Sequence, residues 1–416
     1  MSKKVIVVGG GIVGLSSAYF LAQEGHEVIV IDKSNLDSGA SYINAGYITP
    51  SHIVSLAAPG MITKGLRYMF DSSSPFYMKP RWDLDFFKWA WSFKKSATSR
   101  KVARAMPIIR DLNLLGRELY DSFKTLDTFE DFHLENKGLL MIYKTEKERD
   151  HEAKTASRAE ELDLEVTHLN RQELQKLEPN VQINASGAFY YLCDRHMTPS
   201  TFMQALQNYL LGKGVKIIGN EEVQDFHLEG DTIKSIQTDK QVYDLEELVL
   251  ASGSWTSRLA KKLNVRIPLQ AGKGYGINVT TDTGISMPAL LLEAKIAVTP
   301  MRGFTRFAGT MEFSGINDTI RKERIEAIAS SAGDYYEGLQ INDKDKRMAG
   351  FGLRPVTPDG LPYIGRASKF KNLTIATGHA MMGWSTGPAT GKLVSELISD
   401  KKISMDIEPF YPERSF

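Results

Sequence analysis

The first 32 residues constrain the fold more than any other part of the chain. Val5–Val8 is a short apolar, β-branched run of the kind found in strands buried on both faces, and Val28–Ile31 repeats it. Between the two runs, apolar residues recur at helical spacing from residue 15 to residue 22, and Gly25 supplies a helix stop. The sequence therefore predicts a strand, a helix and a second parallel strand that ends at Asp32.

The glycines between the first strand and the helix fit the pattern G-x-G-x-x-G. In this pattern Gly9 permits a tight turn, Gly11 lets the backbone approach a pyrophosphate, and Gly14 lets the helix pack closely on the strand. The helix N-terminus attracts the anion, and Asp32 can accept hydrogen bonds from a ribose hydroxyl. We therefore predict a dinucleotide site, and we count three neighbours among its contacts: Ile12, Val13 and Lys33.

Composition narrows the function classes. The 416 residues carry 51 basic and 50 acidic side chains, a balance that argues against a surface for nucleic acid, which usually shows a basic excess. The single cysteine, Cys193, cannot form an internal disulfide or a structural zinc site, so we expect no metal and a reducing compartment. We expect neither a secretory signal nor a transmembrane span. An acid at position 32 disfavours NADP, but the glycine motif alone leaves NAD and FAD open.

Four further segments carry a resemblance to a known family. In chain order they read Gly39–Gly46 (GASYINAG), 248–255 (LVLASGSW), Phe351–Gly365 (FGLRPVTPDGLPYIG) and 377–384 (TGHAMMGW). Together they resemble the FAD-dependent glycine/D-amino acid oxidase (DAO) family, and within it the branch of D-amino acid dehydrogenase catalytic subunits. The resemblance implies FAD as the cofactor.

The resemblance also implies which residues lie along the cofactor. These residues are small, lie in turns, or precede the last predicted helix: Ser41, Asn44, Ala45, Gly46, Val223, Ala251, Gly253, Trp255, Gly378, His379, Gly383, Trp384, Ser385 and Thr386. An N-terminus of that helix aimed at the flavin would stabilise the negative charge of the reduced ring. For each glycine taken alone, an ordinary tight turn is the alternative.

Two residues are predicted to serve the substrate. The resemblance implies that Arg354 holds a carboxylate, because a planar guanidinium can grip it through two parallel bonds; an ordinary ion pair is the alternative. Tyr275 resembles a family tyrosine near the pocket, and a core aromatic is an equal alternative. His52 and His379 are candidates for a general base, but we assign neither a catalytic role, because a neutral amine can be oxidised without one.

The cysteine also bears on the cofactor. Relatives that attach FAD covalently use a cysteine in the C-terminal half or a histidine just after the first glycine loop. Cys193 lies at neither place and reads as a small buried residue, so we expect noncovalent FAD.

The apolar runs are dispersed along the chain, which predicts an α/β fold with a non-contiguous Rossmann-like FAD-binding domain and a mixed-sheet α+β substrate domain. We assign 1–60, 197–262 and 348–416 to the FAD-binding domain, and 61–196 and 263–347 to the substrate domain.

Residues 81–95 hold three of the five tryptophans together with several lysines. We expect Trp82, Phe86, Trp89 and Phe93 to share one helical face. A helix packed on the substrate domain is the favoured interpretation, and a helix in a membrane interface is the alternative. The expected location is the cytoplasm, with peripheral contact at the cytoplasmic face of the inner membrane under that alternative.

The resemblance implies oxidative deamination of a D-amino acid. Hydride transfer from Cα to flavin N5 would give an imino acid that water hydrolyses to a 2-oxo acid and ammonia, and the electrons would pass to a quinone, another carrier or oxygen. Three alternatives stay open: a glycine- or sarcosine-type amine oxidase that makes hydrogen peroxide, a hydroxyproline dehydrogenase, and, more remotely, a flavin-dependent tRNA-modification module.

Overall fold

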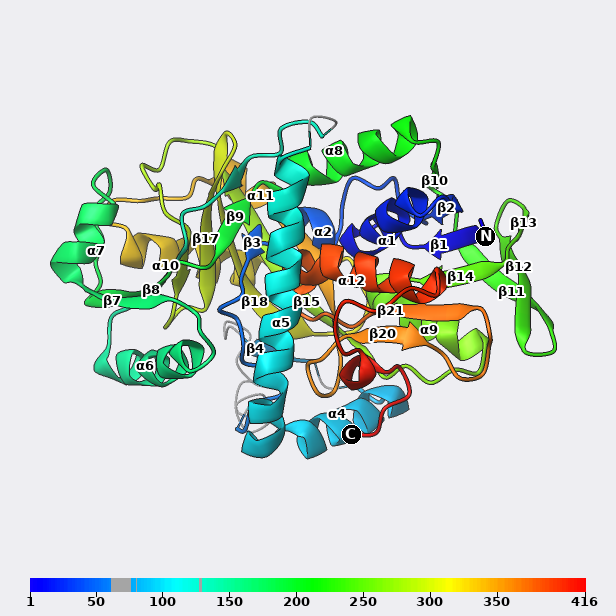
Figure 1. Cartoon of the computed structure of the whole chain (residues 1–416). Helices are drawn as coiled ribbons and strands as arrows, with labels where there is room; N and C mark the ends of the chain where they lie inside the picture. The colour runs from blue at the N-terminus through cyan, green and yellow to red at the C-terminus, as the bar shows by residue number, and fades with distance from the viewer. Residues whose placement is uncertain (61–75, 80, 127–128) are drawn as a thin grey trace.

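The computed structural model describes residues 1–60, 76–79, 81–126 and 129–416 (Figure 1). The N-terminal βαβ unit forms as predicted, with β1 (Lys4–Val8), α1 (Ile12–Gln23) and β2 (Glu27–Ile31). Gly25 has φ +80, the left-handed conformation that ends a helix. The two strands pair in parallel and are almost entirely buried, which is why their sequences are continuous apolar runs.

A six-stranded sheet is built around this unit, on the right of Figure 1. Its order is β10-β2-β1-β14-β21-β20, parallel except for the antiparallel pair β20 and β21. The added strands are β10 (Lys216–Ile218), β14 (Glu247–Leu250), β20 (Tyr363–Arg366) and β21 (Leu373–Thr377). Strands from three distant parts of the chain thus complete one Rossmann-like sheet, and the predicted non-contiguous Rossmann-like fold is confirmed.

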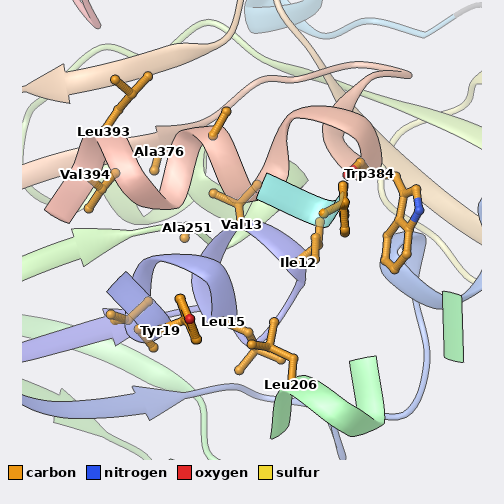
Figure 2. Packing of buried hydrophobic residues seen from close by; sticks show 14 of the residues in the cluster. Ile12, Val13, Leu15, Tyr19, Leu206, Ala251, Ala376, Trp384, Leu393 and Val394 are labelled. Carbon is orange, nitrogen blue, oxygen red and sulfur yellow. Dashed lines mark hydrogen bonds between the residues drawn. The ribbon is translucent and has the colours of Figure 1, made fainter. Parts of the chain in front are cut away.

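Helices cover this sheet and share one apolar core (Figure 2). They are α1, α5 (Ser99–Lys124), α8 (Pro199–Gly212) and α12 (Gly383–Ile398). Close approach of α1 and α12 depends on Gly387 and Gly391, where an added Cβ would press on Ile12 and on the backbone of Ser16. The two helices therefore lie nearly backbone to backbone.

The second large sheet has nine strands and mixed direction, as expected for the substrate domain. Its main path is β19-β15-β18-β17-β16-β6-β8-β7, with β4 paired to β18. Its strands are β4 (Phe76–Met78), β6 (Leu139–Tyr143), β7 (Val166–Asn170), β8 (Gly187–Tyr191), β15 (Gln270–Val279), β16 (Ala289–Leu291), β17 (Ile296–Met301), β18 (Phe304–Phe313) and β19 (Gly350–Val356). A separate core of aliphatic and aromatic residues lies against it.

Smaller elements complete the structure. Two three-stranded sheets are formed by β11 (Val223–Glu229), β12 (Thr232–Thr238) and β13 (Val242–Asp244), and by β3 (Tyr47–Ile48), β9 (Arg195–Met197) and β5 (Leu134–Glu135). The remaining helices are α2 (Ala40–Ile43), α4 (Leu84–Ser96), α6 (Glu146–Glu160), α7 (Arg171–Leu177), η1 (Gly253–Trp255), α9 (Thr256–Lys262), α10 (Lys322–Tyr335), α11 (Asp343–Arg347) and η2 (Glu408–Phe410).

The predicted domain ranges stay a prediction. Two packing observations are relevant to them. β19, in the range assigned to the last FAD-binding segment, pairs with β15 of the nine-stranded sheet. α5, in the range assigned to the substrate domain, lies against α12, where Gly116 abuts the backbone of Ser385. The two sheets are therefore joined along β19 and α5 and not only through linkers.

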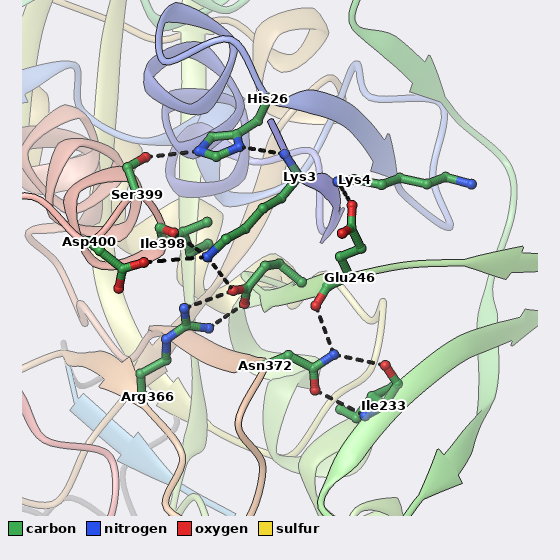
Figure 3. Close-up of polar contacts among 11 residues, drawn as sticks. Lys3, Lys4, His26, Ile233, Glu246, Arg366, Asn372, Ile398, Ser399 and Asp400 are labelled. Carbon is green, nitrogen blue, oxygen red and sulfur yellow. Dashed lines mark hydrogen bonds and ion pairs between the residues drawn. The ribbon is translucent and has the colours of Figure 1, made fainter. Parts of the chain in front are cut away.

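A polar network connects the start of β1 to the end of α12 (Figure 3). The Lys3 ammonium donates to Glu247 at 3.1 Å and to the Ile398 carbonyl at 2.7 Å, and Arg366 pairs with the same carboxylate. His26 accepts from the Lys3 backbone N–H at 3.0 Å. These contacts fix the base of the six-stranded sheet, away from the carboxyl ends of its strands.

The aromatic segment forms α4, but not with the single face that we expected. Phe86, Trp89 and Phe93 are buried, and the Trp89 indole N–H donates to the Val356 carbonyl at 2.9 Å. Trp82 precedes the helix and is 98% exposed, so the prediction that it shares their face is wrong. The favoured interpretation was a helix packed on the substrate domain. It is correct for the buried face of α4, which contacts residues of β18 in the nine-stranded sheet, such as Phe313.

Candidate active site

A cavity of about 820 Å³ lies between the carboxyl ends of β1, β2 and β14 and the edge strand β19 of the large sheet. This is where open α/β sheets bind ligands, and the volume is in the range of small-molecule sites. Sixteen of the predicted site residues line it: Gly9, Gly11, Ile12, Val13, Asp32, Lys33, Ser41, Asn44, Val223, Ala251, Gly253, Trp255, Arg354, His379, Gly383 and Trp384.

The glycine loop has a geometry that suits a close anionic ligand. Gly9 has φ +115, and an added Cβ would lie 2.5 Å from the Ala251 carbonyl. A Cβ at Gly14 would overlap the Gly9 carbonyl, so this residue serves helix-to-strand contact and not the cavity. A Cβ on Gly11 would meet only the Ser41 hydroxyl, at 3.1 Å. The backbone at Gly11 is thus the part of the loop that is open to a ligand.

The polar groups around the loop are already ordered. Asp32 accepts from the Gly10 N–H at 2.6 Å and from the Ser34 N–H at 2.7 Å, which holds its carboxylate at the end of β2. The Ser41 hydroxyl accepts from the Ile12 N–H at 2.9 Å, so α2 is fastened to the N-terminus of α1. This N-terminus and that of α12, at Gly383, both reach the cavity and give it two positive helix ends.

A buried arginine positions the end of α2. Arg306, on β18, donates to the carbonyl oxygens of Tyr42 at 2.7 Å and Asn44 at 2.8 Å. Burial lowers the pKa of Arg306 to about 10, so the side chain remains charged at neutral pH. The segment from Ser41 to Asn44, with its predicted contacts, is therefore held against the large sheet.

Arg354 lies on β19 and lines the cavity. Its Nη1 donates to the Thr310 carbonyl at 2.8 Å. No carboxylate within the described ranges forms an ion pair with it. Burial lowers the pKa of Arg354 to about 10, which leaves the guanidinium charged. A cationic group without a counter-ion in a cavity is suited to bind an anionic substrate group.

Tyr275 is not brought into the cavity. Strands β15 and β19 pair so that Tyr275 lies opposite Phe351, whereas Arg354 lies opposite Gly272. Because alternate residues face opposite sides of a sheet, Tyr275 and Arg354 point away from each other. Tyr275 is 1% exposed and donates to Glu312 at 2.9 Å. It occupies the core-aromatic position that we gave as the alternative.

His379 is buried and His52 is half-buried. His379 lines the cavity, lies within hydrogen-bond distance of the Thr390 hydroxyl at 2.8 Å, and has its pKa lowered to about 3 by burial. Burial also lowers the pKa of His52, which is not among the cavity-lining residues. Both rings are therefore neutral at physiological pH, and His379 has a structural partner that accounts for its position.

The other predicted site residues lie behind the cavity wall. Ala45 and Gly46 meet the β17 and β9 strands, since the Ala45 carbonyl accepts from Thr299 at 2.7 Å and the Gly46 carbonyl accepts from the Met197 N–H at 2.9 Å. Gly378 has φ +86 and abuts Thr357. Ser385 and Thr386 bond to Thr49 and Met382.

Several lining residues were not predicted. Some lie inside the motif segments but were not named as contacts, such as Gly39, Tyr42, Gly352 and Met381. Others come from segments without a motif: Glu221, Arg258, Lys262, Gly274, Asp318 and Ile320. Only Gly274 carried a usable signal, because a glycine inside a strand often marks a close approach. The described residues contain no group of three or more His, Cys, Asp or Glu side chains placed to hold a metal ion.

The family model for DAO, described as FAD dependent oxidoreductase, matches residues 4–397. The chain belongs to this family. Its cofactor is therefore FAD, and the cavity fits this group through its open glycine backbone, two helix N-termini and the carboxylate at the end of β2.

The chain is similar to known enzymes both in sequence and in structure. A protein of Helicobacter pylori named D-amino acid dehydrogenase is 32% identical over 402 residues, covering 96% of each chain. A Neisseria gonorrhoeae protein of the same name is 29% identical over 96% of each chain. Glycine oxidase from Geobacillus kaustophilus shares the fold with a TM-score of 0.78 at 21% identity, covering 100% of this chain and 99% of its own. L-proline dehydrogenase from P. horikoshii gives 0.72 at 18% identity, covering 99% and 97%.

Proposed function

We propose that this enzyme oxidises the Cα–N bond of a D-amino acid and releases a 2-oxo acid and ammonia after hydrolysis of the imino acid. The observation that carries the proposal is Arg354, a charged guanidinium that lines the cofactor cavity and has no carboxylate partner in the described part of the chain. The proposal also draws support from the relatives named D-amino acid dehydrogenase.

This chain's own residues would bind the substrate and the cofactor and orient them relative to each other. The guanidinium of Arg354 would take the substrate carboxylate in two charge-assisted bonds, which fixes the direction of Cα. The N-termini of α1 and α12 would hold the anionic parts of the cofactor. FAD supplies the redox chemistry when bound, as acceptor of a hydride equivalent. His379, neutral and bonded to Thr390, would not serve as a base.

The test is anaerobic bleaching of the flavin absorbance by D-amino acids, L-amino acids, glycine, sarcosine and hydroxyprolines. D-amino acids should bleach it fastest. Arg354→Ala should lower kcat/KM by about 30- to 5,000-fold, since removing one partner of a buried charge pair costs about 2–5 kcal/mol. Arg302→Ala is the matched control, because Arg302 is half exposed and pairs with Asp131 outside the cavity. Unchanged kinetics in Arg354→Ala, or faster bleaching by L-amino acids, would contradict the proposal.

We further propose that the FAD is noncovalent. Cys193, the only cysteine, is not among the cavity-lining residues, and its thiol donates to Asp194 at 3.3 Å. The lining histidine, His379, is engaged with Thr390. Acid precipitation should leave the flavin in the supernatant, and flavin retained in the pellet would contradict a noncovalent cofactor.

We also propose peripheral contact with an anionic membrane surface, at the cytoplasmic face. The supporting feature is the outer face of α4, where Leu84, Phe87 and Trp91 are 76%, 48% and 59% exposed, together with Trp82 just before the helix, which is 98% exposed. Lysines 94 and 95 lie 5.6 and 5.8 Å from the Trp91 ring. Exposed aromatics beside ammonium groups suit a bilayer interface. The described helices include none long and apolar enough to cross a membrane.

Vesicle sedimentation tests this contact. The FAD-loaded enzyme should pellet with phosphatidylglycerol vesicles at low salt and be released at high salt, because the lysine contribution is screened. Trp82→Ser/Trp91→Ser should abolish pelleting, while Leu211→Ser, which removes an apolar residue of α8 that is about as exposed as Trp91, should not. Wild type that stays in the supernatant at low salt would rule the contact out.

A further inference from the structure

We propose that Gly274 and Thr310 are positioning residues that hold the Arg354 guanidinium in its place for substrate. The inference rests on the proposed function, because it concerns the site that would take the substrate carboxylate. It adds two residues from different strands, β15 and β18, to a single arginine on β19.

Gly274 provides the space in which the guanidinium lies. It pairs with Gly352 of β19, and its missing side chain points to the same side of the sheet as Arg354. A Cβ built on Gly274 would overlap Nη1, Nη2 and Cζ of Arg354. The planar head group therefore lies directly over the Gly274 backbone. Any larger residue there would push the whole guanidinium away, although the flexible arginine side chain could move without unfolding the sheet.

Thr310 provides the hydrogen-bond acceptor. The register between β15 and β18 shifts at this point, since Lys273 pairs with Glu312 but Tyr275 pairs with Gly309. Thr310 lies in the resulting bulge with φ +67, a conformation that is unfavourable for a β-branched residue. Its hydroxyl is buried and has no hydrogen-bond partner among the described residues.

In this conformation the Thr310 carbonyl accepts from Nη1 of Arg354 at 2.8 Å. A neutral carbonyl orients the guanidinium without cancelling its charge, as a carboxylate would. The remaining N–H groups keep their full attraction for a substrate carboxylate. A guanidinium that is already held in one orientation also loses less entropy on binding.

The experiment measures carboxylate binding without turnover. FAD-loaded wild type, Gly274→Ala, Thr310→Gly and Arg354→Ala are titrated with pyruvate, a 2-oxo acid product, and the change in flavin absorbance gives Kd. The melting temperature of each is recorded. Gly309→Ala is the control, because Gly309 neighbours Thr310 but its added Cβ would face Ile296, not Arg354.

Gly274→Ala should raise Kd by about tenfold or more at an unchanged melting temperature. Thr310→Gly should raise Kd severalfold, because the more flexible glycine backbone no longer fixes the direction of the carbonyl at position 310. It should also raise the melting temperature, because glycine accepts positive φ without strain. A purely structural role would not weaken binding while it stabilises the fold. Gly309→Ala should leave Kd within about twofold.

Two outcomes separate this inference from the function on which it rests. If Arg354→Ala binds pyruvate as tightly as wild type, the carboxylate role of Arg354 fails, and the positioning role fails with it. If Arg354→Ala loses binding while Gly274→Ala and Thr310→Gly keep it, the proposed function stands and the positioning inference is overturned.

Discussion

Replacing Gly391 by alanine should destabilise the enzyme, although the same change inside a helix is normally favourable by about 1 kcal/mol. Gly391 is in the middle of α12, where the helix crosses α1. An added Cβ would lie 2.6 Å from the Ser16 carbonyl oxygen and 2.6 Å from the Ser17 N. These are backbone atoms of a helix, so a side-chain rotation cannot relieve the contact.

The helices must therefore separate. Overpacking of this kind costs about 1–3 kcal/mol, and the separation would also open the two helix N-termini that line the cofactor cavity. We expect Gly391→Ala to lower the melting temperature and to release FAD at lower temperature, followed as the rise in free flavin fluorescence. Gly212→Ala is the matched control: it lies at the end of α8 with nothing within 4 Å of an added Cβ, and it should be neutral or stabilising. If Gly391→Ala is as stable as wild type, the backbone-to-backbone contact is not what sets the helix spacing.

Two further predictions concern charge. His379 and His196 both have their pKa lowered to about 3 by burial, so below pH 6.5 the unfolded chain binds protons that the folded chain does not. Stability should therefore fall by about 2–3 kcal/mol per histidine between pH 7 and 4.5, and His379→Gln should lose its share of that fall in urea titrations at the two pH values. Glu247→Gln should lower the free energy of unfolding by about 1–3 kcal/mol, because it leaves Arg366 without its buried carboxylate partner. Glu246→Gln, at the exposed neighbouring position, should change it by less than about 0.5 kcal/mol in the same urea titration. Equal effects of the two substitutions would contradict the role given to the buried carboxylate.

The parts of the fold that the sequence predicts well are those that depend on residues close together in the chain. The βαβ unit depends on apolar runs and glycines within 32 residues, and Gly9 and Gly14 are crowded by nearby backbone as such a turn requires. The aromatic segment shows the limit of this reasoning. Periodicity gave Phe86, Trp89 and Phe93 one face, but it could not show that β18 covers that face while Trp91 remains exposed.

Residues that reach the cavity from unrelated segments leave no pattern. Arg258 and Lys262 share one face of α9, and Asp318 lies in the loop after β18, yet nothing in their local sequences distinguishes them from ordinary surface charges. Their placement follows from the packing of the two sheets against each other, which depends on contacts between positions far apart in the chain.

The glycines of β15 carried a signal that separates Arg354 from Tyr275. Glycine occupies positions 272 and 274, while lysine and tyrosine occupy 273 and 275. In a strand, such alternation gives one bare face and one face with large side chains. The bare face is where a neighbouring group can approach closely, and the structure places the Arg354 guanidinium there. Tyr275 must then lie on the other face, whatever the register of β19. The alternation therefore argues against Tyr275 as a partner of Arg354, and the contact of an added Cβ with the guanidinium identifies Gly274 as the residue whose size decides whether the guanidinium fits.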